Sequence, residues 1–296
     1  MTMRSAKTTI RMSMMNVVHD LSVLVARDAG LFREEGLDVD VIATAGTARA
    51  NPVGEALHAK IFDRGLDQYR MCEWGVMKRT VEAVQSGQRP AKIVALGAAM
   101  TRMAIVTYPA RGIYEPEQLK DRPIAVSPYN GSHFTTLKML EGFLEKIHIQ
   151  VTHAGTMLER IEAVRRGEVA AANVMEPWIS VVQKQGFRVI MESNSTRAEA
   201  ASDDLDGSTL AALFRAQARA AARINQDPAH YAHYFVAEAQ GLLEPHELQT
   251  WRLLYGPPAP YTRERFQDTY RWMQGYPNLV APGATYEEVV DNRAWQ

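Results

Sequence analysis

The sequence predicts an α/β protein with open, mostly parallel sheets flanked by helices. Segments with the residue alternation of strands are separated, along most of the chain, by segments with the spacing of amphipathic helices. Strands that alternate with helices pair in parallel, because each connecting helix returns the chain to the same end of the sheet. The length of 296 residues exceeds what one compact core usually holds, so two lobes are expected.

The first part of the chain predicts four strands and three helices. The strands are residues 8–15, 39–42, 67–72 and 91–99, and the helices are 20–32, 51–65 and 76–87. Gly36 provides a stop before the second strand. Asn51 provides a cap and Pro52 suits the first turn of the second helix, which Gly65 ends.

The alternation of strands and helices then repeats in a second unit that begins near Ala104 with the strand at 103–109. A further strand is predicted at 122–127 and a helix after it, and from about Ser208 the chain becomes helical. Apolar residues have helical spacing in 209–239 and 244–256, with Pro or Gly at the breaks.

Composition and charge argue against nucleic-acid binding and against a membrane-spanning protein. Hydrophobic residues make up 46% and charged residues 23%, which is typical of a globular protein. A net charge of −1 and a pI near 6.7 give no broad basic surface, so nucleic acid is not expected as a partner. No segment approaches the roughly 20 apolar residues that span a bilayer.

The expected location is the cytoplasm. The single cysteine cannot form an intramolecular disulfide, so the chain carries no sign of an oxidising compartment. The first residues lack the apolar stretch and cleavage site of a signal peptide, and a periplasmic location would require a presequence that has been removed.

Four motifs carry a resemblance to a known family. They are VARDAGLFREEGLDVDVI (25–42), EPEQLKDRPIAVSPYNGSHF (115–134), AVRRGEVAAANVMEPW (163–178) and YEEVVDNRAW (286–295). In this order they resemble the type II periplasmic-binding-protein superfamily, specifically the nitrate, taurine and aliphatic-sulfonate (NitT/TauT) substrate-binding proteins of ABC importers and their relatives in thiamine-pyrimidine synthesis.

The resemblance implies two lobes with a ligand cleft between them that shuts by hinge motion. Lobe 1 would comprise residues 1–105 and 196–296, and lobe 2 residues 106–195, with hinges near 104–109 and 191–197. The implied function is to bind one small anionic or zwitterionic organic molecule, as a substrate-binding protein that would meet an ABC permease if exported, or as a cytoplasmic relative.

The loop NVVHD (16–20) after the first strand is where the family places ligand contacts. The resemblance makes Asn16, His19 and Asp20 ligand-binding candidates. Asp20 could instead cap the following helix without touching the ligand, and the sequence leaves both open.

The loop PYNGSHF (128–134) is the best candidate anion site in the sequence. Gly131 permits close backbone approach, Ser132 offers a hydroxyl and an N-cap, and the helix N-terminus presents free amides. Tyr129, Asn130 and His133 complete the predicted ligand-binding set. A protonated His133 would strengthen anion binding as pH falls toward 6. An ordinary capped helix is the alternative.

The turn NVMEPW (173–178) offers Glu176 and Trp178 to the cleft. A carboxylate there would repel a doubly charged anion and favours a ligand with an amine or a hydrogen-bonding heterocycle. Trp178 could equally be a core aromatic.

The stretch RMCEWG (70–75) ends the third strand. Strand alternation separates Cys72 from Glu73 unless the strand ends between them, and we expect Cys72 to be a small buried hydrophobe. Glu73, at the carboxyl end of the strand, is predicted to face the ligand together with Trp74.

An enzyme of the same fold is the alternative function. A cofactor-independent lyase, such as an aromatic-acid decarboxylase, would use Glu73 and His19. The resemblance to aromatic sulfinate desulfinases through His58, Arg70 and Glu73 lacks their cysteine after the first strand, and the cysteine-rich segment of the pyrimidine synthases is absent. No nucleotide-cofactor motif occurs, no cofactor is predicted, and the His230/His233 pair has no cysteine partners for a metal.

Overall fold

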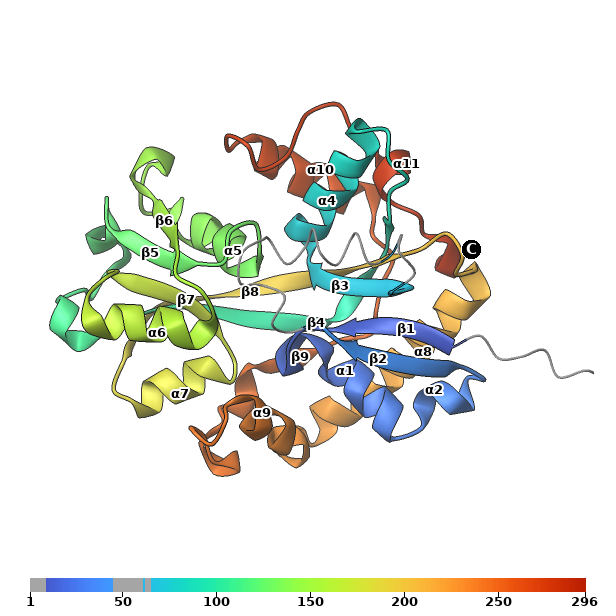
Figure 1. Ribbon diagram of the computed structural model, residues 1–296, viewed down its shortest axis with the longest axis horizontal. Helices are drawn as coiled ribbons and strands as arrows, with labels where there is room; N and C mark the ends of the chain where they lie inside the picture. The colour runs from blue at the N-terminus through green and yellow to red at the C-terminus, as the bar shows by residue number, and fades with distance from the viewer. Residues whose placement is uncertain (1–8, 45–60, 62–64) are drawn as a thin grey trace, which may run out of the picture.

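One mixed sheet organises the chain. The computed structural model describes residues 9–44, 61 and 65–296, and in these residues nine strands form a sheet in the order β2-β1-β3-β8-β4-β7-β5-β6, with β9 beside β4 (Figure 1). The strands are β1 (Thr9–Met14), β2 (Asp38–Ala43), β3 (Gln68–Cys72), β4 (Lys92–Thr107), β5 (Pro123–Val126), β6 (Gln150–His153), β7 (Ala171–Met175), β8 (Arg188–Ala201) and β9 (Leu253–Tyr255).

The helices lie on both faces of the sheet. They are α1 (Val17–Asp28), α2 (Leu31–Glu34), α4 (Glu73–Gln85), α5 (Gly131–Leu140), α6 (Met157–Arg166), α7 (Trp178–Lys184), α8 (Gly207–Gln226), α9 (Ala232–Glu238), α10 (Arg263–Gln274) and α11 (Tyr286–Val289). In Figure 1, α5, α6 and α7 surround β5–β7 on the left, while α1, α2 and α8 lie with β1 and β2 on the right.

Two long strands join these halves of the sheet. On one side β2, β1 and β3 are parallel, and on the other side β7, β5 and β6 are parallel. Between them β4 and β8 run antiparallel to each other along almost their whole length. The predicted open, mostly parallel sheets flanked by helices are therefore confirmed. The lobe boundaries at 105/106 and 195/196 remain a prediction.

The predicted hinges at 104–109 and 191–197 overlap this strand pair. Within it, the register between β4 and β8 shifts at Ile105 and Val106, which pair with Met191 and Val189. An extra residue in one strand bends the ladder locally. The irregularity thus lies inside the first predicted hinge segment and at the edge of the second, and the hinge motion itself stays a prediction.

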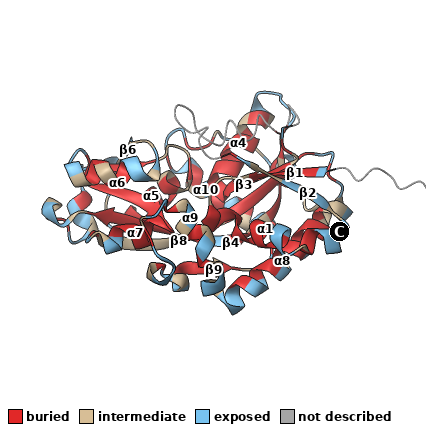
Figure 2. Cartoon of the chain, turned by 60° about the horizontal axis from the view of Figure 1, so that its bottom comes forward, coloured by how far each residue is buried: buried red, intermediate tan, exposed pale blue. Residues whose placement is uncertain are grey.

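The hydrophobic core is divided by the sheet. Along β4, Ala104 and Val106 belong to one buried cluster with α1, α7 and α8, whereas Ile105 belongs to the other with α4, α5 and α10. This division follows from strand geometry, since successive side chains point to opposite faces. The inner strands β3 and β7 are buried along their whole length, whereas the edge strands β2 and β6 are partly exposed throughout (Figure 2).

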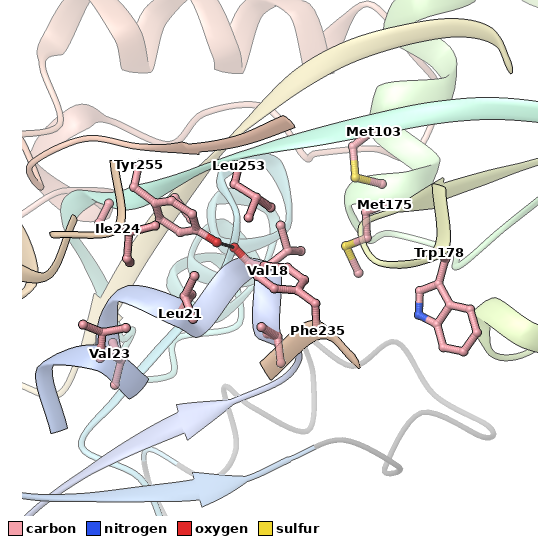
Figure 3. Packing of buried hydrophobic residues seen from close by; sticks show 14 of the residues in the cluster. Val18, Leu21, Val23, Met103, Met175, Trp178, Ile224, Phe235, Leu253 and Tyr255 are labelled. Atoms are coloured by element: carbon pink, nitrogen blue, oxygen red, sulfur yellow. Dashed lines mark hydrogen bonds between the residues drawn. The ribbon is translucent and has the colours of Figure 1, made fainter. Parts of the chain in front are cut away.

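One buried hydrogen bond ties the late strand β9 to the first helix. The hydroxyl of Tyr255 donates to the carbonyl oxygen of Val18 over 2.8 Å, within a cluster of apolar side chains that includes Leu21 and Phe235 (Figure 3). The chain after residue 201 therefore packs back against its beginning.

Most predicted elements of the described residues are present, with three corrections. The strands predicted at 91–99 and 103–109 are one strand, β4. The helix predicted at 20–32 begins earlier and is two helices, α1 and α2, separated by Gly30 in the left-handed conformation. The helix predicted at 244–256 is wrong. The helix predicted at 51–65, with His58, lies almost wholly outside the described residues.

The failed helix has a physical reason. Residues 245–247 and 250–252 form isolated 3₁₀ turns, and 253–255 form β9, which pairs with β4. Leu253 and Tyr255 are buried against the sheet, so tertiary packing overrides the local helical spacing.

Candidate functional site

The carboxyl ends of five strands, two from one parallel half-sheet and three from the other, converge on a small cavity of about 140 Å³. Ligands of open α/β sheets bind at such ends. From one half of the sheet come residues at the ends of β1 and β3, and from the other come residues at the ends of β5, β6 and β7. The walls include Met15, Asn16, His19, Met71, Cys72, Met103, Ser127, Asn130, Gly131, Ser132, Gly155, Thr156, Met157, Arg160, Met175 and Arg197.

The N-terminus of α5 forms one wall. The N-cap position of α5 is Asn130, whose side chain makes no hydrogen bond to the helix amides. Ser132 lies inside the helix, so the predicted Ser132 cap is wrong. Ser132 instead accepts a hydrogen bond from the Ser127 amide at 2.9 Å, and Asn130 donates to the Ser127 hydroxyl at 2.8 Å. Helix N-termini attract anions through unpaired amides and the helix dipole.

Two guanidinium groups complete the cavity. Arg197, on β8, donates from Nε to the Thr101 hydroxyl at 3.1 Å, and its buried Nη2 has no hydrogen-bond partner among the described residues. Arg160, on α6, donates to the carbonyl oxygens of Gly155 and Asn173. Burial lowers the pKa of each arginine to about 10, so both remain cationic at neutral pH.

These two arginines differ from the other buried ones. Among the described residues five arginines are buried, and Arg70, Arg79 and Arg252 each pair with a carboxylate at 2.7–2.8 Å. Within the same part of the chain, Arg160 and Arg197 have no carboxylate within ion-pair distance, and the charges of Asp20 and Glu73 act on Arg197 only from farther away. A buried charge without a counter-charge is costly. The uncompensated positive charge is thus concentrated at this cavity.

His19 adds neutral polar atoms to the cavity. It is 6% exposed, and neither ring nitrogen has a partner among the described residues. Burial, followed by the charges of Arg197 and Arg70, holds the pKa of His19 well below its usual value. The ring is therefore neutral at neutral pH, with one nitrogen able to donate a hydrogen bond and the other able to accept one.

Cys72 lines the same cavity, but its buried surroundings disfavour the thiolate form that a nucleophile needs. The strand ends between Cys72 and Glu73, so these neighbours point to different places. Burial raises the pKa of the Cys72 thiol to about 11, despite the nearby charge of Arg197. A protonated thiol is a poor nucleophile, which agrees with the predicted packing role.

Glu73 and Trp74, predicted to face the ligand, line neither this cavity nor the larger one beside it. The Glu73 carboxylate pairs with Arg265 at 2.6 Å and also accepts hydrogen bonds from Thr196 and Thr269. Trp74 packs on Phe134, with ring centroids 5.9 Å apart. The start of α4 thus faces α10 instead of the cleft.

Asp20 is also used internally. The N-cap of α1 is Asn16, not Asp20, because Asn16 Oδ1 accepts from the His19 amide at 3.2 Å. The Asp20 carboxylate instead accepts from the Met15 amide at 2.7 Å and pairs with Arg70 at 2.8 Å. It therefore holds the loop that carries Asn16 and His19.

His133 and Tyr129 lie behind the α5 wall. His133 Nδ1 accepts from the Tyr129 amide at 3.1 Å, and burial lowers the His133 pKa to about 4. The expected rise in affinity toward pH 6 is therefore wrong, since His133 is already neutral there. Tyr129 has positive φ (55°), whereas Gly131 does not.

Glu176 and Trp178, at the start of α7, have different surroundings. Glu176 is fully buried and binds Ser180 and Arg252, so its predicted repulsion of dianions in the cavity does not apply. Trp178 lines a larger cavity of about 650 Å³ that also contains Asn16 and Glu238.

Sequence reasoning missed Arg160 as a ligand-binding candidate and considered Arg197 only as a hinge residue. Met157, Arg160, Ile161 and Val164 have the spacing of one buried helical face, so an arginine within that face was a usable signal. Arg197 lies on a strand in which polar and apolar residues are buried alike, and its partner Thr101 is distant in sequence. That arrangement carries no local signal.

The described residues contain neither a candidate metal site nor a candidate membrane span. No group of three or more His, Cys, Asp or Glu side chains in them could hold a metal ion. His230 and His233 have ring centroids 6.5 Å apart. Over the same residues, no helix combines the length and the apolar character needed to cross a bilayer.

Comparison with solved structures shows the fold. The chain superposes on the periplasmic aliphatic sulphonate binding protein SsuA of Escherichia coli with a TM-score of 0.74 and 15% identity, over 98% of this chain and 100% of that one. SsuA of Xanthomonas axonopodis pv. citri, bound to MOPS, gives a TM-score of 0.71 and 13% identity over 97% of each chain. No protein-family model and no curated protein matches the sequence.

A third structure gives the same result. The periplasmic nitrate-binding protein NrtA of Synechocystis PCC 6803 has a TM-score of 0.73 and 13% identity, over 95% of this chain and 84% of that one. At these identities the likeness establishes the fold alone. The chain therefore has the type II periplasmic-binding-protein fold.

Replacing Glu73 tests its structural role. Glu73→Gln removes the charge that pairs with Arg265, so we expect the free energy of unfolding to fall by about 1–3 kcal/mol in urea titrations. Glu168→Gln, at an exposed ion pair with Arg166, is the control and should lower stability far less. Unchanged stability in Glu73→Gln would contradict this role.

Glu238 should make stability pH-dependent. Burial raises its pKa from 4.5 to about 7, so the folded state binds this proton more tightly than the unfolded chain does. Its contribution therefore destabilises the fold progressively as pH rises from about 4.5 to about 7.

The measurement is the free energy of unfolding between about pH 4 and about pH 8, a range that brackets this titration. Glu238→Gln should flatten the curve and be about 1–2 kcal/mol more stable than the parent at the upper end. The exposed Glu117→Gln serves as the control. A parent-like pH dependence in Glu238→Gln would refute the assignment.

Proposed function

We propose that this protein binds one small organic anion in the cavity at the carboxyl ends of the strands, as a solute-binding protein. The observation that carries the proposal is the pair of buried, uncompensated arginines, Arg160 and Arg197, at that cavity. A bound anion supplies the counter-charge that the chain itself does not.

The geometry supports a sulfonate or carboxylate as the bound group. Guanidinium groups donate several hydrogen bonds to such oxygens at once, and charge-assisted bonds are stronger than neutral ones. The amides at Gly131 and Ser132 open α5 and add the positive end of its dipole. His19 and Asn130 supply neutral polar atoms on the remaining sides.

The cavity also supports a capture mechanism. Its walls come from both predicted lobes, with His19 and Arg197 on one and Ser132 and Arg160 on the other. An anion that bridges them gains its full set of contacts only when the lobes are close together. Binding would therefore favour the closed arrangement, through bending of β4 and β8.

The structural neighbours support an anionic ligand. Their names refer to sulfonates and nitrate, both of which are anions. Delivery to an ABC permease would follow if the protein is exported, and a cytoplasmic relative would use the same cavity as a sensor or carrier. The lyase alternative is not favoured, because Glu73 does not share a cavity with His19.

Neutralising Arg197 should abolish most of the affinity. We expect Arg197→Gln and Arg160→Gln each to weaken binding of benzenesulfonate and benzoate by at least about tenfold in isothermal titration, because each loses a charge-assisted contact. Without ligand, Arg197→Gln should be no less stable than the parent, since it removes an uncompensated buried charge.

The control for this experiment is Arg89→Gln, which changes an exposed arginine paired with Asp203 and should leave affinity within about twofold. Tight binding that persists in both cavity variants would place the anion elsewhere.

Gly131 should tolerate no side chain when the anion is bound. A Cβ atom there would lie 3.3 Å from Arg197 Nη1, so Gly131→Val pushes the guanidinium out of position. We expect affinity for benzenesulfonate to fall by more than about tenfold through lost charge-assisted bonds. Gly142→Val, at a position with open space, is the comparison, and equal affinities in the two variants would rule out this approach.

A further inference from the structure

A second, larger cavity lies beside the arginine-lined one. Its volume is about 650 Å³, against about 140 Å³ for the first. The two share Met15, Asn16, Thr156, Met157 and Met175 in their walls, so they adjoin. We refer to the larger cavity as the chamber and to the smaller one as the anion pocket.

The chamber is walled mainly by apolar side chains. They are Met14, Met15, Val17, Leu24, Met157, Leu158, Met175, Trp178, Tyr234 and Ala237. The two charged residues in its wall are Arg27 and Glu238. Arg27 is held by the Asp28 carboxylate at 2.7 Å, and Glu238 accepts a hydrogen bond from the Val17 amide at 2.6 Å. The chamber therefore lacks the uncompensated positive charge of the anion pocket.

Methionines are concentrated around the two cavities. Of the 14 in the chain, Met14, Met15, Met71, Met103, Met157 and Met175 line one or both. Met103 and Met175 are register partners on β4 and β7, and Figure 3 shows them side by side, with Trp178 further along the same side of the cluster. Methionine side chains adapt their shape and make favourable contacts with aromatic rings.

We propose that the ligand is a monoanionic organic acid with a bulky, ring-bearing apolar body, whose acidic group occupies the anion pocket and whose body fills the chamber. This inference rests on the proposed function, because it uses the same anion pocket. A small inorganic anion would leave the chamber wall unused, whereas each buried methylene raises affinity roughly fourfold.

A second negative group on the body is disfavoured. The chamber wall contains the Glu238 carboxyl, and Arg27, its one cationic group among the described residues, is already paired with Asp28. An anion placed there would lose its water without gaining a free counter-charge. The two cavities together thus select for one acidic group at one end of the molecule.

The test compares four probes by isothermal titration at one pH and ionic strength. They are methanesulfonate, naphthalene-2-sulfonate, naphthalene-2,6-disulfonate and neutral 2-naphthalenemethanol. We expect naphthalene-2-sulfonate to bind at least about a hundredfold more tightly than methanesulfonate and at least about tenfold more tightly than the other two.

The outcomes separate this inference from the proposed function. If methanesulfonate and naphthalene-2-sulfonate bind within about threefold of each other and both lose affinity in Arg197→Gln, the ring-bearing body is refuted while anion binding stands. If the alcohol binds as tightly as naphthalene-2-sulfonate, the acidic group contributes nothing to affinity. The proposed anion pocket, and with it the requirement for an acidic ligand, would then be refuted. If none of the probes binds, both proposals fail.

A chamber variant provides a second readout. Leu158 lines the chamber but not the anion pocket and is 38% exposed, so Leu158→Gln is compatible with folding. It should weaken naphthalene-2-sulfonate by about three- to tenfold and leave methanesulfonate within about twofold. Ile147→Gln, at an aliphatic residue 74% exposed, is the matched control. Equal losses for both sulfonates in Leu158→Gln would overturn the inference.

Discussion

The antiparallel pairing of β4 with β8 is the contact on which the rest of the molecule depends. It joins two parallel half-sheets that would otherwise share few contacts, and it fixes the distance between their carboxyl ends. It also brings Thr101 on β4 against Arg197 on β8, which orients the guanidinium toward Gly131 of the other half. A change in this ladder would therefore alter the sheet and the anion pocket together.

Buried charge is distributed unequally around this frame. Glu73, Glu176 and Asp20 each stand near the end of a strand, but each is bound to an arginine of the same chain. Their pairing stabilises loops and helix starts and leaves no carboxylate for the cavity. Carboxylates pair with the other three buried arginines of the described residues. Arg160 and Arg197 have no such partner among the same residues and are therefore available to an external anion. The polar interior thus acts partly as a scaffold and partly as a site.

If the proposed ligand binds as described, the anion pocket and the chamber would recognise its two parts in different ways. Fixed donors on short segments, such as Ser132 and Arg160, provide directional binding to oxygen atoms. Flexible methionines provide apolar contact that tolerates variation in the shape of the ligand. A site built in this way would be strict about the acidic group and tolerant of the body attached to it, which suits a protein that collects related acids.

The sequence by itself determined the order of most strands and helices, because residue alternation and helical spacing are local. It also predicted the loop of Asn16 and His19 and the α5 start at Gly131, which follow strands and reach the cavity. Tertiary structure alone decided the site's charges. In the folded chain, Glu73 and Glu176 form ion pairs with Arg265 and Arg252 and do not line the cavity. Arg160 and Arg197 line it instead. Such pairings join residues far apart in the chain, and a carboxylate that will find an arginine partner looks the same in sequence as one that will face a ligand.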